Sequence, residues 1–109
     1  MNMLSKEKCV PCEGDVDPMT SVEVAVLMPD VEGWRRENSK KIWKEFEFKN
    51  FVQAVDFINR IADVAEYEDH HPDLILHGYK YVRVELFTHA IKGLSRNDFI
   101  VAAKINEIA

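Results

Sequence analysis

The sequence predicts an α+β domain in which helices cover one face of an antiparallel sheet. Between about residues 50 and 69, apolar side chains such as Phe51, Val55 and Ile58 recur at helical spacing, which is typical of an amphipathic helix. Between residues 80 and 89 apolar and polar side chains alternate strictly, which is typical of a strand with one buried face. Separate runs of strand and helix of this kind favour an antiparallel sheet with helices on one face.

The first half of the domain begins with a short helix. Thr20 and Glu23 have the spacing of a capping box, so we expect a helix directly after Thr20. From residue 34 to residue 48 the apolar period changes to two, which predicts a strand. Turn residues at 37–39 make residues 34–36 the first arm of a hairpin with that strand.

The second half contains a hairpin and a last helix. Pro72 ends the long helix, because it cannot donate a helical hydrogen bond. Residues 73–76 are expected to pair with the alternating segment at 80–89 through a turn at His77-Gly78. Ser95 is expected to cap the last helix.

Composition and charge limit the classes of function. The 109 residues are 47% hydrophobic, which is enough for the core of one domain. The net charge of -5 argues against nucleic acid or an anionic membrane as a partner, because both require a basic surface. No apolar run approaches the ~20 residues of a membrane helix.

The N-terminal residues have no periodicity. We expect residues 1–18 to form a flexible tail and residues 19–109 to form the domain. The tail holds Cys9 and Cys12 in a CxxC arrangement, which is weak evidence for zinc or redox chemistry outside a βαβ context. Because the tail lacks the apolar stretch of a signal peptide, we expect a cytoplasmic protein with two reduced thiols.

Two adjacent histidines follow the long helix. Glu66 lies four residues before His70, a spacing at which side chains meet on a helix. The negative end of the helix dipole favours a protonated imidazole, and Pro72 turns the backbone of His71 into an extended conformation. The pair is therefore suited to general acid catalysis near neutral pH. A solvated helix end with two surface histidines explains the pattern equally well.

His89 and Asp98 are two further candidates. His89 ends the predicted strand, where a rigid element can present a catalytic group, although many such histidines are only structural. Asp98 has the spacing of a capping box from Ser95, so it either caps the last helix or serves the site as well. These two residues could also join His70 and His71 as metal ligands, but no HxH or HxxxH spacing supports a metal site.

The candidate positions follow one another as a single string: Glu66, His70-His71-Pro72, Tyr79, His89 and Asp98. This string resembles the pterin-4a-carbinolamine dehydratase family, and the similarity extends over about residues 18–108. The chain departs from the pattern at one place. Six residues separate Pro72 from Tyr79, whereas many members of the family have five, so the wall of the pocket is expected to differ there.

The resemblance implies a fold, a reaction and a set of site residues. It implies three helices on a four-stranded antiparallel sheet, in a homodimer or homotetramer. It implies a dehydratase that removes water from a 4a-hydroxytetrahydropterin to give the quinonoid dihydropterin, with no cofactor besides this pterin substrate. By position, His70 and His89 would be the catalytic acid–base pair. The substrate-binding residues would be His71, Glu66 and Asp98, of which the two carboxylates would tune and orient the histidines.

Two alternatives of other classes remain open at this point. The same fold could serve as a dimerising module that binds a protein partner, although binding alone does not require three histidines. The same pocket could also act on a different pterin, of the molybdenum-cofactor type.

Overall fold

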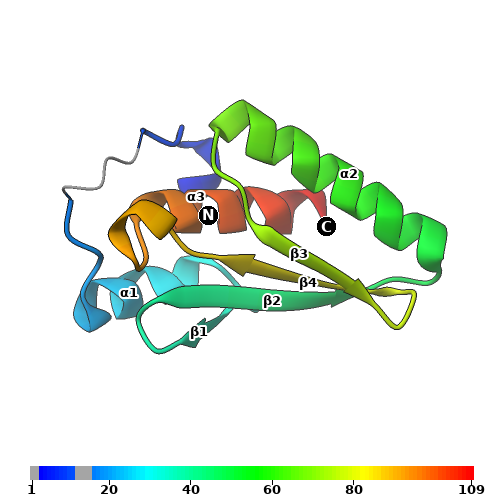
Figure 1. Ribbon diagram of the computed structural model, residues 1–109, viewed down its shortest axis with the longest axis horizontal. Helices are drawn as coiled ribbons and strands as arrows, with labels where there is room; N and C mark the ends of the chain where they lie inside the picture. Colours follow the sequence, from blue (N-terminus) through cyan, green and yellow to red (C-terminus); the bar gives the residue numbers. More distant parts are fainter. Residues whose placement is uncertain (1–2, 12–15) are drawn as a thin grey trace.

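A computed structural model describes residues 3–11 and 16–109, which form a four-stranded antiparallel sheet and three α-helices (Figure 1). The strand order is β1-β2-β4-β3. The predicted α+β fold class is confirmed. In chain order the α-helices, strands and 3-10 turns (η) are η1 Leu4–Lys6, α1 Ser21–Leu27, η2 Met28–Asp30, β1 Arg35–Glu37, β2 Lys41–Glu47, α2 Phe51–Glu68, β3 Asp73–His77, β4 Tyr81–Leu86, η3 His89–Ile91 and α3 Arg96–Ile108.

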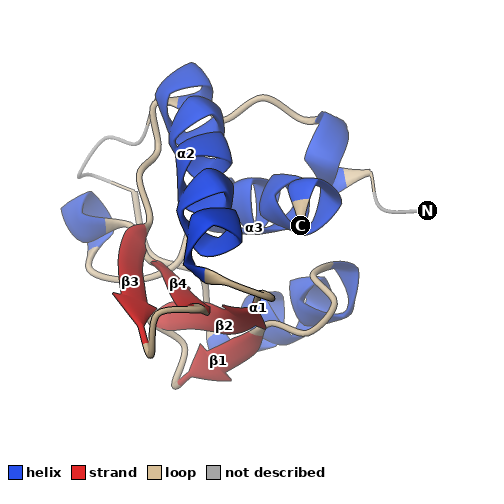
Figure 2. Ribbon diagram, turned by 90° about the vertical axis from the view of Figure 1, so that its right-hand side faces the viewer, coloured by secondary structure: helices blue, strands red, loops and turns tan. Residues whose placement is uncertain are grey.

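The core lies between the sheet and the helices α2 and α3, which cover one face of the sheet (Figure 2). Phe57 of α2 and Phe99 of α3 are fully buried together with Ile42 and Leu86 of the sheet. Full burial of a side chain of this size contributes about 1.5–3 kcal/mol. Helix α1 adds Val24 to the same core. None of the helices in the described ranges is long and apolar enough to cross a membrane.

Helix ends agree with the capping signals in the sequence. The predicted capping box of α1 is confirmed, because the backbone N–H of Thr20 donates to Glu23 Oε1 at 2.8 Å and the Glu23 N–H donates to Thr20 Oγ1 at 3.2 Å. Helix α2 ends at Glu68, and its C-cap residue Asp69 has the left-handed φ of 52°. This residue turns the chain out of the helix just before the two histidines.

The turns around β4 differ from the sequence-based prediction. His77 still pairs with Tyr81 in the sheet, so the turn lies after His77, with Gly78 and Tyr79 at positive φ of 54° and 56°. Strand β4 ends at Leu86, and the prediction that His89 ends this strand is therefore wrong. The physical reason is that Thr88 forms an isolated antiparallel bridge with Gly93. The residues between them form a tight loop that contains η3, and His89 lies in this 3-10 turn.

Residues 3–11 pack on the domain, although the sequence predicted a flexible tail. Leu4 is 3% exposed and Cys9 is 8% exposed. Burial raises the pKa of the Cys9 thiol to about 12, and the negative charge of Glu68 adds to the shift, so the thiol stays protonated at neutral pH. Cys12 lies outside the described residues.

Candidate active site

The three predicted histidines line one cavity of about 380 Å³. It lies where the C-terminal end of α2, the residues after β4 and the start of α3 come together. His70 and His71 reach it from the end of α2, and His89 reaches it from η3. Phe87 and the N-terminal residues Val10 and Pro11 complete much of the lining.

A buried carboxylate holds His70. Asp98 Oδ1 lies 2.6 Å from His70 Nε2, and the side chains are 0% and 11% exposed. The other carboxylate oxygen, Oδ2, accepts hydrogen bonds from Thr88 Oγ1 at 2.8 Å and from the Ser95 N–H at 3.0 Å. Asp98 therefore caps α3 with one oxygen and fixes the His70 ring with the other. This contact leaves Nδ1 of His70 as the nitrogen that can exchange a proton with a ligand.

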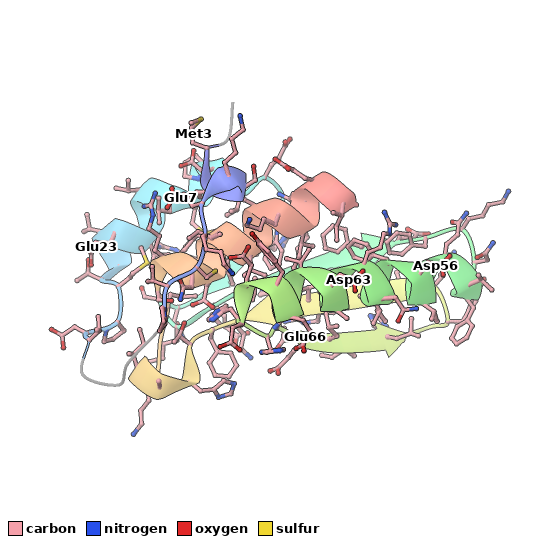
Figure 3. The ribbon with its side chains drawn as sticks, turned by 90° about the horizontal axis from the view of Figure 1, so that it is seen from above. Met3, Glu7, Glu23, Asp56, Asp63 and Glu66 are labelled. Atoms are coloured by element: carbon pink, nitrogen blue, oxygen red, sulfur yellow. The ribbon has the colours of Figure 1, made fainter. Side chains whose placement is uncertain are left out.

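His71 makes a second contact with a carboxylate, at the surface. Its Nε2 lies 2.5 Å from Glu66 Oε2, and the two side chains are 56% and 76% exposed; Glu66 lies toward the C-terminal end of α2 (Figure 3). The prediction that Glu66 meets His70 is wrong. Asp69, in the left-handed conformation, ends the helix, so helical spacing does not extend to His70. The backbone N–H of His70 instead donates to the backbone carbonyl oxygen of Ala65.

His89 is held less firmly than His70. Its ring lies against Phe87, with 4.0 Å between ring centroids, and the side chain forms no ion pair or hydrogen bond with any other described residue. An exposed imidazole beside an apolar ring can approach a ligand from a second direction. The cavity thus combines one histidine fixed by a carboxylate with one that is free to adjust.

A second hollow, of about 460 Å³, adjoins the site and shares Phe87 and His89 with it. Three lysines line it, Lys40, Lys41 and Lys92, together with the acidic residue Glu37. Lys41 also forms an ion pair with Glu85 at 2.9 Å. In the part of the chain that the structure describes, no group of three or more His, Cys, Asp or Glu side chains is arranged to hold a metal ion.

Sequence reasoning missed several residues of the site. Val10 and Pro11 lie in the expected tail, where no periodicity marks them as structural. Asn97 also lines the cavity. In the sequence, only its position next to Asp98 could have indicated a role in the site. Tyr79, in contrast, lies at the exposed β3–β4 turn and is not among the lining residues of this cavity.

Known proteins resemble this chain over most of its length. A family model described as Pterin 4 alpha carbinolamine dehydratase matches residues 17–108. A protein of Halorhodospira halophila, whose name places it in that family, is 43% identical over 106 residues, with 96% of each chain covered. The protein named Pterin-4-alpha-carbinolamine dehydratase 2, mitochondrial, of Arabidopsis thaliana is 47% identical over 109 residues, which cover 96% of this chain and 58% of the plant protein. A crystal structure of a transcriptional coactivator/pterin dehydratase from Brucella melitensis matches with a TM-score of 0.79 and 33% identity, covering 85% of this chain and 99% of that one.

Proposed function

This chain belongs to the pterin-4a-carbinolamine dehydratase family, and from that premise we propose how its histidine site carries out the family's reaction. The activity is that of a hydro-lyase, pterin-4a-carbinolamine dehydration. The substrate that we propose is a 4a-hydroxytetrahydropterin. Loss of water gives a quinonoid dihydropterin, which can then be reduced for reuse by a pterin-dependent hydroxylase.

The elimination requires two proton transfers. A general acid protonates the 4a-hydroxyl, the C4a–O bond breaks and water leaves, and a general base removes a proton from a ring nitrogen. An imidazole with the ordinary histidine pKa of about 6.5 can do either near neutral pH. We assign this work to His70 and His89, because both line the same cavity.

The remaining site residues have supporting roles in this proposal. Asp98 is completely buried, so it acts on the pterin only through His70, whose ring it orients. His71 and Glu66 lie at the exposed side of the site, where we assign them to pterin binding.

The observation that carries the proposal is the buried His70–Asp98 pair at 2.6 Å, in a cavity that His89 also lines. The test is the dehydration rate of freshly generated 4a-hydroxytetrahydropterin with and without the purified protein. We expect a rate well above background, and we expect chelator treatment to leave it unchanged, because the described residues hold no metal-binding group. A rate equal to background would contradict the proposal, and loss of turnover on removal of a bound metal would contradict the metal-free mechanism.

One observation favours a second candidate substrate. The hollow lined by Lys40, Lys41 and Lys92 opens beside His89, and it would favour a pterin that carries an anionic substituent, as a molybdenum-cofactor type pterin does. A panel of 4a-hydroxytetrahydropterins with neutral and phosphorylated side chains would distinguish the two. Higher kcat/KM for the phosphorylated compounds would support this candidate.

Assembly and location are also proposals. The sheet face opposite α2 and α3 carries the partly exposed rings of Trp43 and Tyr81, and a second copy of the chain would cover these aromatic side chains. We therefore propose a homodimer or homotetramer. We also propose that the protein acts in the cytoplasm, without a nucleic-acid or membrane partner.

A further inference from the structure

We propose that residues 3–11 form a fixed wall of the pterin site, in which Val10 and Pro11 contact the bound pterin. In this proposal Asn97 and Glu68 are positioning residues that hold the wall in place. The inference rests on the proposed function, and it concerns a segment that lies before residues 17–108, the part that the family model matches. We call residues 3–11 the N-terminal strap.

The strap begins with an apolar anchor and an ion pair. Leu4 in η1 is 3% exposed and belongs to the hydrophobic core. Glu7 accepts two hydrogen bonds from Arg96, from Nε at 2.8 Å and from the terminal Nη2 at 2.5 Å. Figure 3 shows Glu7 on this segment, close to α3. The start of the strap is thus fixed to the first residue of α3.

A buried carboxylate fixes the middle of the strap. The side chain of Glu68 is 0% exposed, and its Oε1 accepts the Cys9 N–H at 2.8 Å while its Oε2 lies 3.0 Å from Lys104 Nζ. Burial disfavours the charged form, but the Cys9 hydrogen bond and the Lys104 ion pair outweigh it and lower the pKa of Glu68. A charged, buried carboxylate of this kind requires its partners. Loosening the strap would therefore leave Glu68 without its backbone donor.

An amide clamp fixes the end of the strap at the cavity. Asn97 Oδ1 accepts the Val10 N–H at 3.1 Å, and Asn97 Nδ2 donates to the Val10 carbonyl oxygen at 2.6 Å. Asn97 is 5% exposed, so water does not replace these bonds easily. The next residue, Asp98, holds His70. The same turn of α3 therefore positions both the strap and a catalytic histidine.

The clamp has a clear consequence for the side chain of Val10. The backbone N–H and carbonyl oxygen of Val10 are both hydrogen-bonded to Asn97, yet the residue is 68% exposed. Val10 lines the cavity together with Pro11 and the three histidines. Ligand sites combine apolar walls with a few polar groups that fix orientation. Val10 and Pro11 supply such an apolar wall for the flat pterin ring, while the histidines supply the polar groups.

Three variants of the full chain test the wall. Val10→Asp keeps the backbone clamp and replaces an apolar contact by a charge, and Asn97→Ala removes the clamp and keeps the Val10 side chain. Lys6→Ala is the matched control, because Lys6 is an exposed strap residue away from the cavity. The readouts are the affinity for 7,8-dihydrobiopterin, kcat and KM for the carbinolamine, and hydrogen exchange of the residue 10 amide.

We expect both test variants to bind dihydrobiopterin about tenfold more weakly than wild type and to raise KM by about tenfold, with a much smaller change in kcat. Asn97→Ala should also speed exchange of the Val10 amide, whereas Val10→Asp should not, and Lys6→Ala should match wild type throughout. Wild-type affinity in Val10→Asp would overturn the proposal, as would an unprotected Val10 amide in the wild-type protein. Absence of turnover in a wild-type protein that still binds dihydrobiopterin would instead contradict the dehydratase mechanism. Val10→Asp changes only an exposed side chain, so the test stands even if Asn97→Ala fails to fold.

Discussion

Replacing Asp98 by Asn should separate its role from that of the other carboxylate in the site. Asp98→Asn keeps the shape and an oxygen that can cap α3, but it removes the negative charge beside His70. The matched control is Glu66→Gln, which makes the same chemical change beside His71. Both carboxylates lie within 2.6 Å of a histidine nitrogen, so contact distance alone predicts equal effects.

Burial predicts unequal effects. The His70–Asp98 pair is 11% and 0% exposed, whereas the His71–Glu66 pair is 56% and 76% exposed. A hydrogen bond to a buried charged group contributes about 1.5–3 kcal/mol to stability, and we expect Asp98→Asn to lose an amount in this range. An exposed pair contributes about 0–1 kcal/mol. Because Asp98 orients a proposed acid–base residue, its replacement should also lower kcat by about 100-fold or more.

Urea unfolding and steady-state kinetics on the two variants provide the measurement. We expect Glu66→Gln to change kcat/KM by at most about fivefold, mainly through KM. If Asp98→Asn retained wild-type kcat, or if the two variants lost activity equally, the role given to the buried pair would be refuted.

Three further predictions concern the histidines, the strap and the assembly. His70→Ala and His89→Ala should each lower kcat by about 10²–10⁴-fold, the double variant should approach the uncatalysed rate, and His71→Ala should mainly raise KM; wild-type turnover in a folded double variant would contradict this assignment. Because the pKa of Glu68 is lowered in the folded state, its charge stabilises the protein above the unfolded carboxyl pKa of about 4.3, and this contribution is lost as the pH falls through the folded value. Urea unfolding should therefore show Glu68→Gln to be less stable than wild type at pH 7, with the difference shrinking in acid; a pH-independent difference would count against a stabilising charge. Light scattering at micromolar concentration should give at least the mass of a dimer, and a monomeric mass would contradict the proposed assembly.

Local signals in the sequence predicted the fold well. The capping box at Thr20, the periodic apolar face of α2 and the alternation of β4 each depend on residues that are close in sequence, and the structure confirms all three elements. The end of β4 was mispredicted because alternation continues through Thr88, whereas a hydrogen-bonded pairing with Gly93 decides where the strand stops. Alternation reports which side chains face the core, and it contains no information on which backbone groups find a partner.

The site shows the same division between local and long-range information. The pairing of His70 with Asp98 joins residues 28 apart in the sequence, and no helical or strand period could predict it. The strap was missed for a related reason, since its anchors on the domain are single polar side chains. Glu68 and Asn97 look like surface residues in the sequence, yet each is buried because it binds backbone groups of residues 9 and 10. A segment held by polar side chains rather than by an apolar stripe leaves no periodic pattern. Isolated buried carboxylates and amides are therefore the places where a non-periodic tail can be fixed to a domain.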